Sequence, residues 1–384
     1  MKICIYTGSA LPKIGGHELV VDAPAREFHE LGHQVVVLAP RSSASWRNPN
    51  WPFAYPVVRH PRFVLPKHLL DWYQYPLLRL HDRHTFDVVH VHGIYPAGYV
   101  AAVCQERLGI PLVMTSHGWE ADPTSSQNQD PRVRARLKHA LQSATKLIAI
   151  SRFVRQGYLN IEPGVGRNIV DLPNGVDLAA VSRVVSRPAS LDPRIQPGEY
   201  ALFLGRLDRR KGIDLALRAL AQLPDTGKVQ LVVAGEGGER SALEQLTAQL
   251  GLTGRVLFTG LALGDQKNYL LQNALFSIAP SRGWEGLPLV PLECFAVGRP
   301  VIASDLPGFA DIVLPGETGE QVPEESVEPL AAALKRFFAD RPYVERLGSQ
   351  AKQFVQGYSW RAIAERHLDL YRELIEHSRQ RRAA

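Results

Sequence analysis

The chain has 384 residues, of which 45% are hydrophobic and 21% are charged, and its formal net charge is +6. This balance excludes a disordered or fibrous protein, and the length predicts two or three domains. The three cysteines, Cys4, Cys104 and Cys294, stand far apart without a CxxC pair or a His/Cys cluster, which argues against a disulfide framework or a structural zinc site.

The sequence offers no clear membrane segment. The apolar stretch near the N-terminus is too short for a signal peptide. Residues 88–105 are uncharged, but two histidines, two glycines and a proline interrupt them, so we predict a strand, a turn and the start of a helix. We therefore expect a cytoplasmic protein.

The positive charge is concentrated in the first half of the chain. Residues 1–180 carry 19 Lys and Arg against 14 Asp and Glu, whereas residues 181–384 carry 25 against 24. Segment 41–84 interleaves basic and aromatic residues. This pattern is typical either of a solvated surface excursion or of a face that contacts an anionic membrane surface or an acidic acceptor. Nucleic acid is a weaker candidate because no recognition module accompanies the charge.

Apolar runs of strand length alternate with helix-length segments in the first half. The predicted strands are residues 2–7, 34–40, 87–93, 111–117 and 146–151. This alternation predicts a parallel sheet with helical crossovers. Residues 178–198 follow, with little periodicity, and their 181–198 portion is interpreted as a linker.

The alternation restarts after this segment. Further strands are predicted at residues 200–208, 229–237, 255–261, 275–281 and 300–305. We thus expect an α/β chain of two doubly wound domains, 1–180 and 199–357, with the ligand in a cleft between them at the carboxyl ends of the strands. The chain looks helical from about residue 324, and Trp360, Ile363, His367, Leu370 and Leu374 predict one apolar face on the last helix.

Two glycines stand where the first helix should begin. Gly15 and Gly16 would let a ligand approach the backbone at a helix N-terminus, although a tight turn explains them equally well. They do not form a GxGxxG pattern, because position 19 is Leu, and Gly235 and Gly237 lack a third glycine. The main sequence evidence expected of a nicotinamide-dependent dehydrogenase is therefore missing.

The motif GRLDRRKG (205–212) places two cations directly after a strand. Arg206 and Lys211 are five residues apart, and both could reach toward the expected cleft. Two cations that converge on one point suit a diphosphate, with about 1.5–3 kcal/mol for each charge-assisted contact. An exposed pair on a solvated loop is the alternative.

A pair of glutamates follows at EGLPLVPLE (285–293). Glu285 lies in a predicted loop and Glu293 in a helix that starts near Leu289. The free N–H groups of Leu289 and Val290 would face the anion held by the two cations. Glu293 could accept hydrogen bonds from a ribose diol, and Glu285 could accept them from sugar hydroxyls.

These motifs together resemble a retaining glycosyltransferase of family four, the glycosyl transferases of group 1. The resemblance rests on PKIGGHE, TSHG, AISRFV, LPNGVD, GRLDRRKG, AGEGGER, the spaced glutamates and the final YSW helix, and it runs over nearly the whole chain. It implies the GT-B architecture of two facing Rossmann-like domains. A C-terminal helix, residues 358–384, would cross back to pack on the N-terminal domain.

The resemblance also implies roles for individual residues. Arg206 and Lys211 would grip the diphosphate, Glu293 would bind the ribose, and Glu285 would contact sugar hydroxyls. His117 would sit by the sugar near its anomeric carbon, and it would form the catalytic set together with Arg206, Lys211 and Glu285. The remaining donor-binding residues would be Gly15, Gly16, Gly286, Leu287, Leu289 and Val290.

The implied reaction transfers a sugar from a UDP- or GDP-sugar to a hydroxyl acceptor, with retention and without a metal or other cofactor. No Asp-x-Asp motif appears, and no carboxylate stands out as a nucleophile, in keeping with the front-face attack attributed to the family. Glycan, cell-envelope or glycolipid assembly, with peripheral contact at the inner membrane surface, is the family-level expectation. A sugar-nucleotide epimerase and a non-catalytic sugar-nucleotide-binding protein are the alternatives.

Pro288 departs from the family pattern, and a pair of histidines is left without an assigned role. Pro288 stands where the family commonly has glycine or serine, and it removes a backbone N–H from the loop that would meet the sugar. His90 and His92 share one face of a strand, but no further metal ligands accompany them, so a structural or acceptor-side role is preferred.

Overall fold

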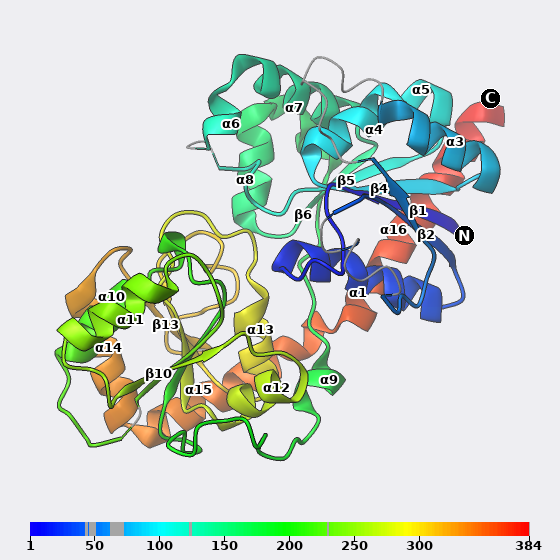
Figure 1. Cartoon of the computed structure of the whole chain (residues 1–384). Helices are drawn as coiled ribbons and strands as arrows, with labels where there is room; N and C mark the ends of the chain where they lie inside the picture. The colour runs from blue at the N-terminus through cyan, green and yellow to red at the C-terminus, as the bar shows by residue number, and fades with distance from the viewer. Residues whose placement is uncertain (43–44, 46–50, 62–72, 123–124, 229, 384) are drawn as a thin grey trace. The chain divides into compact units, whose positions relative to one another are not determined.

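The computed structural model describes residues 1–42, 45, 51–61, 73–122, 125–228 and 230–383. The chain forms two compact units (Figure 1). The first consists of Met1–Gly175 and Trp360–Ala384, and the second of Val176–Ser359. The N-terminal part of the first unit therefore ends five residues before the predicted boundary at 180. The last helix of the chain also belongs to this unit.

The first unit is built on a seven-stranded sheet in the order β3-β2-β1-β4-β5-β6-β7, with every pairing parallel. The strands are β1 (Lys2–Thr7), β2 (Gln34–Pro40), β3 (Val57–His60), β4 (Val88–His92), β5 (Leu112–Thr115), β6 (Lys146–Ala149) and β7 (Ile169–Asp171). Helical crossovers join parallel strands and cover both faces of such a sheet, so its inner strands are mostly apolar, as predicted.

The helices of this unit include one from the far end of the sequence. They are α1 (Gly16–Glu30), α3 (Gln74–His84), α4 (Tyr99–Val103), α5 (Gln105–Leu108), α6 (Ser126–Gln129), α7 (Pro131–Ser143), α8 (Arg152–Ile161) and α16 (Trp360–Ala383), with short turns η2 (Ile94–Gly98) and η3 (Pro163–Asn168). Helix α16 packs against α1, as the red and blue ribbons of Figure 1 show. The five residues predicted to form its apolar face are all buried.

The second unit has a six-stranded parallel sheet in the order β10-β9-β8-β11-β12-β13. The strands are β8 (Ala201–Leu204), β9 (Leu231–Ala234), β10 (Val256–Gly260), β11 (Phe276–Ala279), β12 (Val301–Ser304) and β13 (Gly319–Val322). The strand order reverses between β8 and β11, next to the loops that follow both strands. In doubly wound sheets, ligands bind beyond the carboxyl ends of the strands at such a point.

Helices cover this sheet as well. They are α9 (Leu178–Ser182), α10 (Ile213–Ala221), α11 (Arg240–Gln249), α12 (Gly264–Asn273), α13 (Leu289–Ala296), α14 (Val327–Ala339) and α15 (Arg341–Phe354), with short turns η4 (Arg209–Lys211) and η5 (Val355–Tyr358). The predicted start of a helix near Leu289 is confirmed. The aromatic ring of Phe276 on β11 meets that of Phe337 on α14 at 5.0 Å, inside the apolar core of the unit.

Residues 181–198, interpreted from the sequence as a linker, belong to the second unit. The amide of Gln272 donates to the carbonyls of Val181 and Arg183 at 2.9 and 2.8 Å. Further along, the Arg187 guanidinium donates to the carbonyl of Ile195 at 2.8 Å. The segment is irregular beyond the end of α9 at Ser182, and the carbonyls of Val181, Arg183 and Ile195 are bonded within this unit.

Candidate functional site

A lysine and a glutamate meet beyond the carboxyl ends of β8 and β11. Lys211 Nζ lies 2.6 Å from Glu285 Oε1, and the Ser281 hydroxyl donates to the same oxygen at 2.9 Å. The side chains of Lys211 and Glu285 are only 21% and 9% exposed. The structure thus joins two of the predicted catalytic residues directly, in a position that water reaches poorly.

Glycines allow the close backbone packing that forms this pair. Gly212 has φ +66°, and a Cβ there would lie 1.9 Å from the carbonyl oxygen of Pro280. A Cβ on Gly308 would lie 1.9 Å from the carbonyl oxygen of Glu285. Both positions therefore require glycine. The turn that carries Lys211 and the loop that carries Glu285 are each held against neighbouring backbone.

Side chains also hold the loop 281–285 in place. Arg282 donates to both carboxylate oxygens of Asp214 at 2.6 and 2.8 Å. The guanidinium of Arg210 lies 4.3 Å from the ring centre of Trp284, and its Nη1 donates to the Trp284 carbonyl at 3.4 Å. These contacts were not predicted from the sequence, because they join residues about 70 positions apart.

Arg206, the other predicted diphosphate ligand, is arranged differently. Its side chain is 72% exposed, and its Nε lies 3.7 Å from a carboxylate oxygen of Asp208. An exposed pair at this distance contributes little to stability. The side chain is therefore free to reorient, and convergence of Arg206 with Lys211 on one anion stays a prediction.

Helix α13 begins directly after this loop. Its N-cap is Pro288, which makes no side-chain capping bond, and Leu289 and Val290 at its first turn are half-buried. The first N–H groups of a helix have no intrahelical partner, so this end can bind an anion. Residues Gly286 and Leu287, which precede the cap, are buried.

Glu293 on α13 has a partner that sequence reasoning missed. Lys267 on α12 places its Nζ 2.8 Å from Glu293 Oε1, and the two side chains are 22% and 13% exposed. Nothing in the spacing of the two residues signals this contact, because it depends on how α12 packs against α13. Both predicted ligand-binding glutamates are thus ion-paired with a lysine.

The first unit places the predicted glycine pair at the start of α1. Gly15 is the N-cap, with extended backbone and no side-chain capping bond. A Cβ on Gly15 would lie 2.5 Å from a carboxylate oxygen of Glu18, whereas a Cβ on Gly16 would meet nothing within 4 Å. The fold therefore does not itself require glycine at position 16, which leaves room for a ligand there.

His117 lies in a cluster of histidines beyond the carboxyl ends of β4 and β5. Its Nε2 is 3.0 Å from Nδ1 of His92, and the ring of His17 meets it edge-on at 4.4 Å. His90 bonds the hydroxyls of Thr115 and Tyr371 at 2.8 and 2.6 Å. We predicted from the sequence that His90 and His92 share one face of a strand, but not that His92 contacts His117.

Electrostatics keep this cluster uncharged. Burial, together with His17 and His92, lowers the pKa of His117 well below its ordinary value. Burial and the neighbouring histidines, His90 first among them, likewise lower the pKa of His92. Neutral imidazoles can each donate one hydrogen bond and accept another.

Buried hydrogen bonds fix the loop that carries His117. The Ser116 hydroxyl donates to Glu120 at 2.6 Å, and the backbone N–H of Ser116 donates to the hydroxyl of Tyr158 at 2.7 Å. Glu120 also accepts from the backbone N–H of Ile94 at 2.8 Å, and burial raises the pKa of its carboxyl. The network ties the ends of β4 and β5 together around His117.

Much of the basic and aromatic set in segment 41–84 lies outside the described residues. This applies to Trp46, Arg47, Arg62, Phe63, Lys67 and Trp72. Of the remainder, Tyr73 is buried, and Arg59 donates to the carbonyls of Pro40 and Leu11. The membrane or acceptor role of segment 41–84 stays a prediction.

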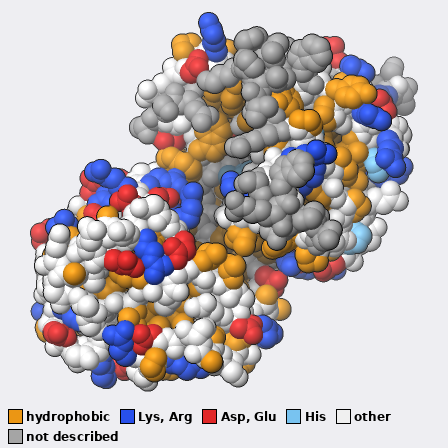
Figure 2. All heavy atoms as spheres, in the orientation of Figure 1, with side chains coloured by type: hydrophobic (Ala, Val, Ile, Leu, Met, Phe, Trp, Pro, Cys, Tyr) orange, Lys and Arg blue, Asp and Glu red, His pale blue; other side chains and the backbone are white. Residues whose placement is uncertain are grey.

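The second unit carries charges of both signs. In Figure 2, Lys and Arg are interspersed with Asp and Glu over this unit.

Neither a metal-binding cluster nor a membrane-spanning helix is found among the described residues. Among these residues, no three His, Cys, Asp or Glu side chains form a group that could hold a metal ion. No helix in the described part of the chain has both the length and the apolar character needed to cross a bilayer.

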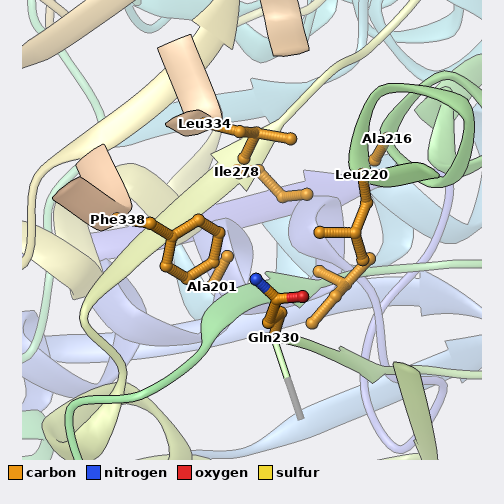
Figure 3. Close-up of a pocket in the computed structure, with 8 residues that line it drawn as sticks. Ala201, Ala216, Leu220, Gln230, Ile278, Leu334 and Phe338 are labelled. Atoms are coloured by element: carbon orange, nitrogen blue, oxygen red, sulfur yellow. The ribbon is translucent and has the colours of Figure 1, made fainter. Parts of the chain in front are cut away.

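A pocket in the second unit lies away from these residues. It is lined by Ala201, Ala216, Leu220, Gln230, Leu231, Ile278, Leu334 and Phe338 (Figure 3). Ala201 and Leu231 are the first residues of β8 and β9, so the pocket lies toward the amino ends of these strands. The Nε–H of Arg255 donates a hydrogen bond to the amide oxygen of Gln230 at 2.6 Å. We interpret the space as a packing gap in the core.

Known proteins resemble the chain over nearly its full length. The family model for glycosyl transferases group 1 matches residues 193–354, and that for glycosyltransferase family 4 matches residues 14–180. An uncharacterized glycosyltransferase of Methanocaldococcus jannaschii is 26% identical, covering 98% of this chain and 99% of that protein. The phosphatidyl-myo-inositol mannosyltransferase of Mycolicibacterium smegmatis is 27% identical, covering 96% and 92%.

A solved structure shares the fold. Anabaena HepE in complex with UDP superposes with a TM-score of 0.82 at 20% sequence identity, covering 97% of this chain and 100% of that one. The predicted GT-B architecture of two doubly wound parallel-sheet domains is confirmed.

Proposed function

Because the chain belongs to the glycosyltransferases of group 1 and family 4, we propose that it transfers a sugar from a UDP- or GDP-sugar to a hydroxyl acceptor, with retention and without a metal ion. The observation that carries this proposal is the enclosed Lys211–Glu285 pair, held by Ser281 at the carboxyl ends of β8 and β11. It places a cation and a hydrogen-bond acceptor where a doubly wound sheet binds its ligand.

The chemistry requires stabilisation of two charges. The bond between the anomeric carbon and the diphosphate oxygen breaks, and its electron pair leaves with the nucleotide. The acceptor oxygen attacks the same face of the sugar, and its proton passes to the departing phosphate. Lys211, Arg206 and the N-terminus of α13 would stabilise the negative charge that develops on the diphosphate.

The other residues would bind and orient the donor. Glu285 would accept hydrogen bonds from sugar hydroxyls, and Glu293 would do so from the ribose. The backbone at Gly15 and Gly16 would approach the phosphate, and His117 would lie by the sugar. The residues around the α13 N-terminus that would contact the donor are Gly286, Leu287, Leu289 and Val290.

The names of similar proteins support the substrate class. The mycobacterial relative is named for transfer of mannose to phosphatidyl-myo-inositol, and HepE was crystallised with UDP. We therefore propose a hydroxyl-bearing glycan, lipid or small molecule as the acceptor. The proposed setting is glycan or cell-envelope assembly on the cytoplasmic side of the membrane, with peripheral contact at an anionic surface.

A screen of UDP- and GDP-sugars by thermal shift identifies the donor, since a ligand at 100 times its Kd adds about 2.7 kcal/mol of stability. Transfer to an acceptor panel is then followed with and without EDTA, and the anomeric configuration of the product is read by NMR. Glu293→Gln should weaken donor binding, and Lys211→Ala should abolish most turnover. An inverted product, or full activity in both variants, contradicts the proposal. An isomerised nucleotide sugar formed without acceptor would indicate an epimerase.

A further inference from the structure

His92 is a buried histidine for which the proposed reaction has no use. It ends β4, is 2% exposed, and bonds His117 through its Nδ1 at 3.0 Å. The two ring planes differ by only 11° and their centres are 5.2 Å apart. Together with the short N···N distance, this is the arrangement of two imidazoles bonded edge to edge, because the N–H bond and the nitrogen lone pair both lie in the ring plane.

The remaining ring nitrogens decide which residue donates. His92 Nε2 is buried and has no hydrogen-bond partner among the described residues. If His117 donated from Nε2, His92 would carry a proton on Nε2 and bury an unpaired N–H. If His92 donates from Nδ1, only a lone pair is left unpaired. Unpaired buried N–H groups are the rarer and more costly case.

We propose that His92 is a positioning residue that donates from Nδ1 to Nε2 of His117 and thereby holds His117 as the Nδ1–H tautomer. His117 then offers one hydrogen-bond donor, Nδ1–H, to a ligand, and its only lone pair is occupied by His92. It can orient a sugar oxygen but cannot act as a base. The statement about the sugar rests on the proposed function; the tautomer does not.

Neighbouring contacts hold both rings. His17 packs edge-on against His117, and His90 lies 4.4 Å from His92 between ring centres. His17 also supplies an internal reference. The single hydroxyl proton of Thr7 is donated to the carbonyl of Ser9 at 2.9 Å, so Thr7 accepts from His17, which must be the Nε2–H tautomer.

The test reads tautomers directly. Long-range ¹H–¹⁵N NMR spectra of the ligand-free, full-length protein at neutral pH distinguish Nδ1–H from Nε2–H rings, and His117→Gln and His17→Gln assign the signals. We expect His117 as Nδ1–H and His17 as Nε2–H in the same spectrum. Finding His117 as Nε2–H overturns the proposal, whether or not the protein transfers any sugar tested.

Two substitutions of His92 separate the hydrogen bond from packing. His92→Asn keeps an N–H donor near the position of Nδ1 and should keep the His117 tautomer, whereas His92→Leu should release it. With the identified donor, His92→Leu should lower kcat about tenfold while UDP affinity is unchanged, and His92→Asn should restore most of kcat. The control His90→Asn alters an adjacent buried histidine that does not bond His117. A tautomer or kcat unaffected by His92→Leu contradicts the positioning role.

Discussion

Removing the charge of Lys211 should destabilise the second unit through Glu285. Lys211→Met leaves the carboxylate of Glu285, which is 9% exposed, with the Ser281 hydroxyl as its remaining partner. Breaking a buried pair costs about 3–5 kcal/mol, and the 21% exposure of Lys211 reduces this to about 2–3 kcal/mol. For a unit of this size, the loss lowers Tm by about 4–12 °C.

The converse substitution should cost less. In Glu285→Gln the unpaired group is a lysine whose flexible chain can carry its ammonium into water, so we expect a loss of about 1 kcal/mol. The double variant Lys211→Met/Glu285→Gln buries no unpaired charge and should recover to within about 1 kcal/mol of the wild type. Sugar transfer should not recover with it, because both side chains are proposed to contact the donor.

Urea unfolding and a transfer assay on the four proteins test this reasoning. Lys228→Met is the matched control, since Lys228 pairs with Glu199 at 3.2 Å but the side chains are 61% and 35% exposed, and it should change stability by less than about 0.5 kcal/mol. A double variant no more stable than Lys211→Met would refute the energetic coupling. A double variant that regains activity along with stability would assign the pair a structural role.

Three further outcomes are expected. Burial lowers the pKa of His367 to about 4, below its value of about 6.5 in the unfolded chain. Between these two values the unfolded state binds more protons, so the protein loses stability as the pH is lowered. At pH 5.0 the loss is about 2 kcal/mol relative to pH 7.5, and His367→Phe should remove that part of the pH dependence of urea unfolding. Gly16→Val should change Tm by less than about 2 °C, because a Cβ there meets nothing, yet weaken donor binding by calorimetry; unchanged binding would exclude a ligand at this backbone. Lys267→Met should reduce the preference for UDP over 2′-deoxy-UDP, because Glu293 loses the partner that orients it, whereas Lys267→Arg should retain the preference; equal preferences in all three proteins would contradict this role.

The sequence was sufficient to predict the inner strands of both sheets. β1, β4 and β5, like β8, β9 and β11, are short, mostly apolar and buried, because layers cover both faces of the sheet. β3, β7 and β13 were not predicted. Segments such as Ile169–Asp171 and Gly319–Val322 are short and carry polar residues, so only pairing with an already formed neighbour identifies them as strands.

The same limit applies to the site. Strand ends and glycines marked Lys211, Glu285 and His117, because local sequence determines where a strand stops and a turn begins. The partners of such residues depend on packing between elements distant in sequence. Lys267 carries no local signal. His92 was noted on one face of its strand together with His90, but its contact with His117 is recognised only once the neighbouring strand is in place.

The acidic residues of the candidate site are charged and ion-paired in the second unit, whereas in the first unit the histidines of the site are neutral. In the second unit, Glu285 and Glu293 are each ion-paired with a lysine through Oε1, so the site is charged before any ligand binds. In the first unit, burial keeps His117 and His92 neutral. In the proposed reaction, negative charge develops on the diphosphate and positive charge on the sugar ring. A cation at position 117 would oppose the second charge, whereas a neutral imidazole that only donates a hydrogen bond can hold the sugar without that cost. The low pKa of His117 is therefore suited to the reaction because it keeps the ring uncharged; it does not make His117 a base.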